Sequence, residues 1–291
     1  MSTATATRRP AYSDWAPGEP LAASGFDVVE PKADGLWGRV EIDGAAVVVY
    51  SRHGSRKASF TLSRPLSAGS AVLHGEYMHG TAWSKARGLT GQILAFDLER
   101  IGGDDLTRRP HRHRRARLER VVVELAATSG GRIECLPSWR ATSGGLDTLA
   151  RESWDRWVLA DGWEGLVFKS AGGIFGETWG RAKRVFEVDY VCTGFEQSDA
   201  DRHRGRAVRS MVGGLYSGRT LRDVVRVSGM TDEERRAMFN HPDRFVGRVF
   251  RASGFGVFKS GALRHPNFLE WHADKASSEC TLRAARSEVT I

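Results

Sequence analysis

The chain has 291 residues, a formal net charge of +8 and a pI near 9.7, and 41% of its residues are hydrophobic. These values exclude a low-complexity or fibrous chain and allow a globular protein of two domains. No apolar run approaches the roughly 18 residues of a membrane span, and the first residues lack the apolar segment of a signal peptide. We therefore expect no membrane partner and a cytoplasmic location, or the host cytoplasm for a phage protein. The positive charge favours a polyanion such as nucleic acid, although many intracellular proteins are basic for other reasons.

The first two thirds of the chain predict a mixture of strands and helices. We expect residues 1–24 to form a loose arm or an edge element. Asp43-Gly44 is a tight-turn signal, and it predicts a hairpin between residues 37–42 and 45–50. Leu118, Val122 and Leu125 recur at helical spacing within residues 115–127. The other expected elements are strands at 26–30, 72–78, 92–98, 133–136, 165–169 and 185–190, and a helix at 146–159.

The pattern changes beyond residue 187 to short segments of strand character separated by glycines. One helix interrupts them, Thr231–Asn240, and its first residues, Thr-Asp-Glu-Glu, match a capping box. Short strands with glycine turns over about 100 residues are typical of a small barrel of the OB type. The predicted fold class is therefore α+β: a mixed, mainly antiparallel domain over residues 1–185, followed by an all-β OB-fold domain over residues 186–291.

A basic run, Arg108–Arg117, contains six arginines and two histidines. Such a run is typical of a solvated loop that enters a helix, and contact with duplex phosphates is the alternative. His111 and His113 are poor candidates for metal ligands, because nothing nearby in the sequence supplies matching partners.

Lys32 lies in Lys-Ala-Asp-Gly, where a tight turn can hold its amine at the mouth of a pocket. A lysine that acts as a nucleophile must be neutral, and desolvation and nearby cations lower its pKa from about 10.4. The alternative is a hairpin turn with an exposed lysine, which is the better interpretation of the four residues alone. Cations that could lower this pKa and bind a triphosphate are Arg39, Arg52, Lys169, Arg181 and Lys183.

Two acids and one aromatic residue lie where they could bind a metal ion or a purine base. Glu76 lies in a strand-like stretch, and Glu164 precedes the apolar strand 165–168. Burying a carboxylate without a cation is costly, and a bound Mg²⁺ would offset that cost for both acids. The alternative is that each acid is exposed at the end of its strand. Phe96 could stack on a purine, although a core phenylalanine is the commoner fate of such a residue.

These motifs occur in a fixed order: Lys32 to Gly35, His74 to Tyr77, Ala95 to Leu98, Trp163 to Lys169, and Trp179 to Lys183. The ordered set resembles the lysine nucleotidyltransferases, and most of all the small bacterial and bacteriophage ATP-dependent DNA ligases, over residues 25 to 282. The resemblance implies an ATP-grasp-like nucleotidyltransferase (adenylation) domain before the OB-fold domain. It implies an enzyme that seals nicks between 3′-hydroxyl and 5′-phosphate ends through a covalent lysyl-AMP and a DNA-adenylate. The implied AMP donor is ATP, the metal is Mg²⁺ and the partner is nicked duplex DNA, bound by a monomer in replication, repair or recombination.

The resemblance also implies a role for individual residues. Lys32 matches the lysine that carries AMP, Glu30 an acid at the adenine edge, and Phe96 the aromatic residue that stacks on adenine. Glu76 matches an acid near the ribose and the metal, and Glu164 a further metal acid. The matching cations near the nucleotide are Arg52, Lys169, Arg181 and Lys183. In the C-terminal segment, Asp274 and Lys275 match residues that close over the site and orient pyrophosphate.

Departures from the family pattern concern charged positions. Trp37 stands where the family has arginine, and we expect Arg39, on the same strand face, to substitute for it. His74 and His272 replace a common aspartate and an arginine, and Arg181 replaces a lysine. Three alternatives stay open: an RNA ligase, an mRNA-capping guanylyltransferase, and a non-catalytic nucleic-acid-binding relative with a degenerate site.

Overall fold

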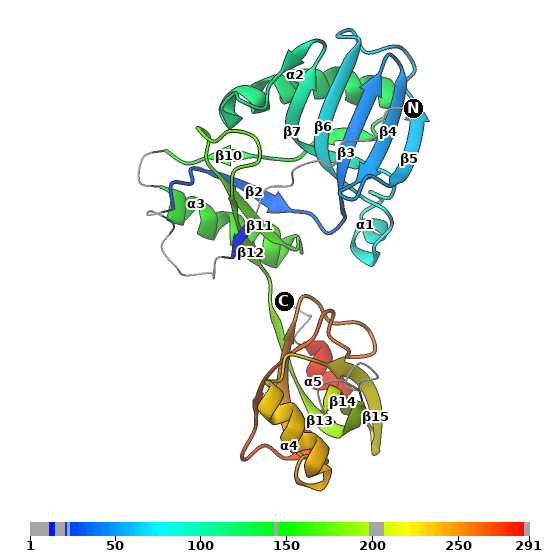
Figure 1. Cartoon of the computed structure of the whole chain (residues 1–291), viewed down its shortest axis with the longest axis vertical. Helices are drawn as coiled ribbons and strands as arrows, with labels where there is room; N and C mark the ends of the chain where they lie inside the picture. Colours follow the sequence, from blue (N-terminus) through cyan, green and yellow to red (C-terminus); the bar gives the residue numbers. More distant parts are fainter. Residues whose placement is uncertain (1–11, 15–20, 22–23, 143–144, 198–206, 288–291) are drawn as a thin grey trace. The chain divides into compact units, whose positions relative to one another are not determined.

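The computed structural model describes residues 12–14, 21, 24–142, 145–197 and 207–287. The chain divides into two compact units, Met1–Lys183 and Arg184–Ile291 (Figure 1). The expected boundary follows residue 185, and this division follows Lys183. None of the described helices is long and apolar enough to cross a bilayer.

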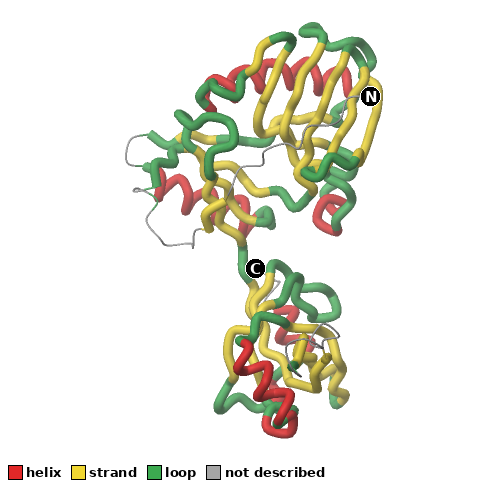
Figure 2. Tube along the Cα trace, in the orientation of Figure 1, coloured by secondary structure: helices red, strands yellow, loops and turns green. Residues whose placement is uncertain are grey.

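The larger sheet of the first unit has seven strands in the order β5-β4-β3-β6-β7-β8, with β9 parallel to β7. Helix α2 (His111–Ser129) lies across one face of this sheet (Figures 1 and 2). Leu118 and Leu125 of α2 are fully buried there against strand residues such as Val40 and Leu73. The strands are β3 Leu36–Asp43, β4 Ala46–Ser51, β5 Arg56–Thr61, β6 Ser70–Tyr77, β7 Ile93–Ile101, β8 Asp104–Asp105 and β9 Ile133–Cys135.

The smaller sheet of this unit has five strands in the order β1-β12-β11-β2-β10. One face packs Leu166 and Phe168 against Ala150 and Trp157, which lie in α3 (Leu146–Ser153) and the following π-helix (Trp154–Ala160). The strands are β1 Tyr12–Asp14, β2 Val28–Lys32, β10 Trp139–Arg140, β11 Gly165–Lys169 and β12 Trp179–Lys183.

A further core cluster joins the two sheets of the first unit. Val167 and Trp179 of the smaller sheet pack in it with Trp37, Leu94 and Phe96 of the larger sheet. Of the predicted site residues of this unit, Phe96 is itself a member of this cluster.

The second unit is built on a five-stranded antiparallel sheet in the order β15-β14-β13-β16-β17. A parallel bridge from Ser228, just after β15, to Asn267 of β17 links the two outer strands. Helix α4 (Asp232–Asn240) begins at Thr231 with the predicted capping box to Glu234. The strands are β13 Phe186–Gln197, β14 Val208–Ser217, β15 Thr220–Val227, β16 Val249–Gly254 and β17 Asn267–Trp271.

The prediction of a mixed, mainly antiparallel fold is confirmed, and its local signals account for much of it. The hairpin of β3 and β4 turns at Gly44, whose φ of 55° favours glycine. The second unit carries the predicted helix α4 and also a short helix that was not predicted, α5 (Leu282–Ser287). Of the loose N-terminal arm, the described part includes β1, which forms a parallel edge strand on β12.

Candidate active site

Strand register places Glu30, Lys32 and Lys183 on one face of the smaller sheet. Gly165 of β11 lies opposite Lys32 on one side and Lys183 on the other, and Val167 lies opposite Glu30. Residues opposite each other in a sheet, and residues two apart along a strand, point to the same side. Because Val167 faces the larger sheet, Glu30, Lys32 and Lys183 face it as well.

Glu164 joins two of these lysines. Its Oε2 lies 2.5 Å from Lys32 Nζ, and its Oε1 lies 2.7 Å from Lys183 Nζ. Burial alone would raise the pKa of Glu164. The ammonium groups of Lys32 and Lys183 have the larger combined effect, so this pKa lies below its usual value. The next residue must be glycine, because a Cβ at Gly165 would lie 1.9 Å from the carbonyl oxygen of Ala182.

Glu76 supports the turn that follows Lys32. The backbone N–H of Gly35 donates to Glu76 Oε1 at 3.2 Å. A Cβ at Gly35 would lie 2.8 Å from both Glu76 Cγ and the carbonyl oxygen of Tyr77. The glycine of Lys-x-Asp-Gly therefore lets the turn pack directly on β6.

Glu30 and Lys169 form a buried ion pair behind this region. Their side chains are each 1% exposed, and Lys169 Nζ lies 2.5 Å from Glu30 Oε2. The ammonium group also lies 4.1 Å from the ring centre of Trp179 and 5.0 Å from that of Phe96. Burial lowers the pKa of Lys169, although Glu30 opposes the shift.

Lys169 therefore does not share the surroundings of Lys32. In the β2–β11 pair, Lys169 lies opposite Val28 and Gly165 lies opposite Lys32, four residues away. At about 3.3 Å per residue the two backbone positions are roughly 13 Å apart along the strands. Phe96 is 6% exposed and packs edge-on to Trp179 with ring centres 5.7 Å apart. Lys169, Glu30 and Phe96 thus form one buried group, and the partly exposed Lys32, Glu164 and Lys183 form a second group.

The basic run contributes three residues whose role was not predicted from the sequence. Arg114 binds both carboxylate oxygens of Asp97, at 2.8 and 2.9 Å. Arg115 Nη1 and His111 Nε2 lie 3.6 and 4.0 Å from Glu30 Oε1. Three atoms here are buried and have no hydrogen-bond partner among the described residues: Glu30 Oε1, His111 Nε2 and Arg115 Nη1. Burial lowers the pKa of His111 to about 4, so this imidazole is neutral at pH 7.

The prediction of a solvated run was wrong for its inward-facing members. His111 and Arg114 are 3% and 1% exposed, whereas Arg112 and His113 are exposed. The signal was available in the spacing: residues 111, 114, 118, 121 and 125 recur at intervals of three and four, which places them on one helix face.

Other predicted residues of the first unit have different partners. Arg39 contacts Glu41, and its guanidinium lies 3.5 Å from Glu99. The Glu99 carboxylate also accepts from His74 Nε2 at 2.8 Å. Trp37 packs on the His74 ring at 5.0 Å. The remaining two cations lie toward solvent: Arg52 is exposed beside His53, and Arg181 pairs with exposed Asp14 at 2.5 Å.

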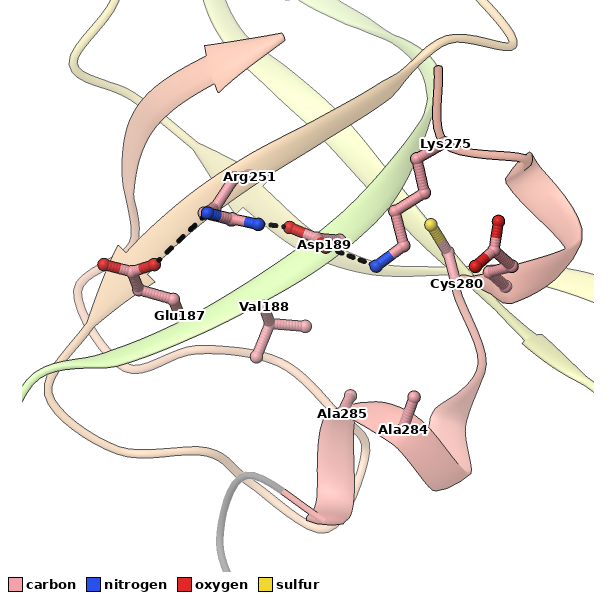
Figure 3. Close-up of a pocket in the computed structure, with 9 residues that line it drawn as sticks. Glu187, Val188, Asp189, Arg251, Lys275, Cys280, Ala284 and Ala285 are labelled. Atoms are coloured by element: carbon pink, nitrogen blue, oxygen red, sulfur yellow. Dashed lines mark hydrogen bonds and ion pairs between the residues drawn. The ribbon is translucent and has the colours of Figure 1, made fainter. Parts of the chain in front are cut away.

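Of the two predicted C-terminal residues, Lys275 lines a cavity of about 240 Å³ in the second unit (Figure 3). Asp189 of β13 receives Lys275 Nζ at 2.6 Å and Arg251 Nε at 3.0 Å, and His272 Nε2 also lies at 3.0 Å. Burial would raise the pKa of Asp189, but the hydrogen bonds from Lys275, Arg251 and His272 lower it. Asp274 is exposed.

The chain was compared with known proteins. No family model matches it. A DNA ligase of Pyrobaculum neutrophilum is 27% identical over 203 residues, which are 58% of this chain and 33% of that relative. The match thus spans a third of the relative's length.

Solved structures give a broader match. The structure named Pmar-Lig_PreS3 has a TM-score of 0.67 and 16% identity, over 90% of this chain and 67% of that one. A structure from a structure–function analysis of Lig E DNA ligases has a TM-score of 0.60 and 16% identity, over 85% of this chain and 93% of that one. The resemblance predicted from the ordered motifs is confirmed, and this chain shares its fold with DNA ligases.

Proposed function

We propose that the chain is an ATP-dependent DNA ligase that seals nicks between 3′-hydroxyl and 5′-phosphate ends through lysyl-AMP. The observation that carries this proposal is the geometry around Lys32. Its amine lies at the end of β2, 2.5 Å from Glu164, in a group that also contains Lys183. Glu30 lies on the same face of the smaller sheet, and Phe96 of the larger sheet shares the Lys169 ammonium group with it; we place the purine base there.

The first step forms the covalent intermediate. Glu164 Oε2 is the acceptor closest to the Lys32 ammonium, and it takes the proton that leaves the amine. The lone pair of Lys32 Nζ then attacks the α-phosphorus of ATP, and the bond to the bridging oxygen breaks with its electron pair on pyrophosphate. Lys183 remains beside Glu164 and offsets the charge of the phosphate groups.

The next two steps are also phosphoryl transfers, so positioning supplies most of the catalysis. An oxygen of the nick's 5′-phosphate attacks the AMP phosphorus, the N–P bond breaks, and the amine of Lys32 recovers a proton. The 3′-hydroxyl then attacks the 5′-phosphorus and loses its proton, and AMP leaves with the electron pair of the broken bond. The products are a sealed strand and AMP.

The buried group supports recognition of the base end of ATP. Glu30 can accept from an exocyclic amino group, and Phe96 offers an aromatic face. The position of Lys169, paired with Glu30 at 2.5 Å, supports a role at this end and not at the phosphates. Arg39, Arg52 and Arg181 remain proposed contacts to the phosphates of the nucleotide or the nick.

The acids fit a weakly held Mg²⁺. The described residues contain no group of three or more metal-ligating side chains, as a dedicated protein cage would require. Mg²⁺ is commonly held by one or two carboxylates together with substrate phosphates, and Glu164 and Glu76 flank the Lys32 turn in this way. When bound, the ion would neutralise negative charge on the phosphate oxygens.

We also propose an OB fold for the second unit. Its strand order, and the Ser228–Asn267 bridge between the outer strands, support a closed five-stranded barrel. In this proposal residues 1–183 bind the nucleotide, and residues 184–291 lie on nicked duplex DNA and supply Asp274 and Lys275 for pyrophosphate. The net charge of +8 supports salt-sensitive contact with DNA phosphates by a monomer.

A nick-sealing assay with ATP and Mg²⁺ on matched DNA and RNA duplexes tests the proposal. Sealing of nicked DNA, lost in Lys32→Ala, supports it. Sealing of RNA alone would indicate an RNA ligase, and protein labelling by GTP alone would indicate a capping enzyme. Duplex binding with neither sealing nor labelling would indicate a non-catalytic relative.

A further inference from the structure

A short segment between β6 and β7, Thr81–Arg87, touches both loops that form the Lys32–Glu164 pair. We call it the α1 segment, because it contains helix α1 (Ala82–Ala86). None of the ordered motifs includes it.

At its first residue the α1 segment binds the Lys32 turn. Thr81 caps the helix, and its hydroxyl oxygen accepts from the backbone N–H of Ser84 at 3.2 Å. Its hydroxyl proton can therefore be donated to the carbonyl oxygen of Asp34, which lies 3.1 Å away. Asp34 is the third residue of Lys-x-Asp-Gly, so this bond reaches the backbone two residues after Lys32.

Further along, the α1 segment binds the loop that leads to Glu164. Trp83 Nε1 donates to the carbonyl oxygen of Gly162 at 2.6 Å, and the Arg87 guanidinium donates to that of Asp161. Arg87 also lies over the Trp83 ring, 4.4 Å from its centre. The Trp83 ring packs edge-on to that of Trp163, with ring centres 5.0 Å apart.

We infer that the α1 segment is a positioning element that fixes the Glu164 loop against the Lys32 turn, an inference that rests on the proposed function. The carbonyl oxygens of Asp161 and Gly162 lie in an exposed loop just after the π-helix. Without Trp83 and Arg87 they would bind water, and the loop would keep more conformational freedom. A displacement of about 1 Å at reacting groups can lower a rate about 100-fold.

The test measures single-turnover formation of lysyl-AMP with labelled ATP, together with the dissociation constant for ATP and the melting temperature. Trp83→Phe keeps an aromatic ring and removes the N–H donor. We expect the rate to fall at least 10-fold, with ATP affinity within 2-fold of wild type and an unchanged melting temperature. Trp139→Phe is the matched control, because Trp139 packs on Trp157 on the opposite face of the sheet, and its rate should stay within 2-fold.

A second pair of variants examines the other end of the segment. Thr81→Val removes the hydroxyl, and we expect it to lower the rate; Thr81→Ser keeps the hydroxyl and should restore it. In the slow Glu164→Gln background, where label is collected over hours, Trp83→Phe should have no further effect, because its action passes through Glu164.

Three results would overturn the inference. The first is a wild-type rate of lysyl-AMP formation in Trp83→Phe, and the second is an equal loss of rate in Trp139→Phe. The third is a further loss of rate when Trp83→Phe is added to Glu164→Gln. Failure of the wild-type protein to form any lysyl-AMP is a different result, since it would overturn the proposed function itself and the inference with it.

Discussion

The buried pair of Arg114 and Asp97 allows a quantitative test of how the basic run folds. The two side chains are 1% and 0% exposed, and both carboxylate oxygens accept from the guanidinium. Arg114 also donates to the carbonyl oxygens of Arg109 at 2.6 Å and Gly173 at 3.1 Å. Arg114→Met keeps a stem of similar length but removes the guanidinium, so the buried Asp97 carboxylate loses its cationic partner.

Removal of one partner of a buried ion pair costs about 3–5 kcal/mol in the free energy of unfolding. For a unit of 183 residues, each kcal/mol shifts the melting temperature by about 2–4 °C, so we expect a fall of roughly 6–20 °C. Urea unfolding at pH 7, followed by tryptophan fluorescence, gives the free energy, and calorimetry gives the melting temperature.

Arg117→Met is the matched control on the same helix. Arg117 contacts Asp104 at 2.8 Å, but the two side chains are 37% and 63% exposed. An exposed pair contributes about 0–1 kcal/mol, so the control should lose at most a few degrees. Equal losses in the two variants would show that Arg114 is solvated, and would refute this account of the helix.

The pair also has a pH signature. Burial would raise the pKa of Asp97, but its bonds to Arg114 outweigh burial and lower that pKa. A carboxylate with a lowered pKa contributes stability that is complete above its unfolded pKa of about 3.9 and is lost as pH falls through the folded value. In Arg114→Met the buried carboxylate has lost this partner and takes up a proton more readily, so the stability gap between wild type and the variant should shrink as pH falls.

Three further predictions concern the site. The pKa of His111 falls from 6.5 to about 4, so its contribution to stability is complete above pH 6.5 and is lost as pH falls toward 4. The loss is on the order of 3 kcal/mol, and urea unfolding should show that His111→Gln removes this pH dependence while exposed His113→Gln does not. Glu164→Gln should slow lysyl-AMP formation about 100-fold or more with an unchanged circular dichroism spectrum; a wild-type rate would remove Glu164 from the site. Residues 1–183 alone should retain ATP affinity but bind nicked duplex at least ~10-fold more weakly than the full chain in a gel-shift assay, and tight duplex binding by that fragment would contradict the proposed roles of the two units.

Local signals in the sequence predicted those elements that local chemistry stabilises. Asp43-Gly44 predicted the β3–β4 hairpin because few residues adopt the turn conformation, and Thr231 predicted α4 because its hydroxyl and Glu234 bind the free N–H groups of the first turn. The two-residue strand β10 was not predicted, and the three-residue strand β1 was covered only by the expectation of a loose arm or an edge element over residues 1–24. They form strands because they pair with β12 and β2, which are distant from them in the sequence.

The site was predicted as a set of residues but not as two groups. Lys32, Glu164 and Lys183 come together because strand register fixes their backbone positions. Lys169 has a long side chain that can reach several places, and only tertiary packing directs its amine to Glu30. His111 and Arg114 were interpreted from their charge, although their spacing from Leu118 placed them on the buried face.

The central claim is that Lys32 carries AMP, and α-labelled ATP tests it most directly. Incubation with Mg²⁺ should leave an acid-labile label on the protein, which mass spectrometry of its peptides should place on Lys32. The label should be absent from Lys32→Ala and should not form from GTP. No label from ATP, or a label on another residue that persists in Lys32→Ala, would contradict the account.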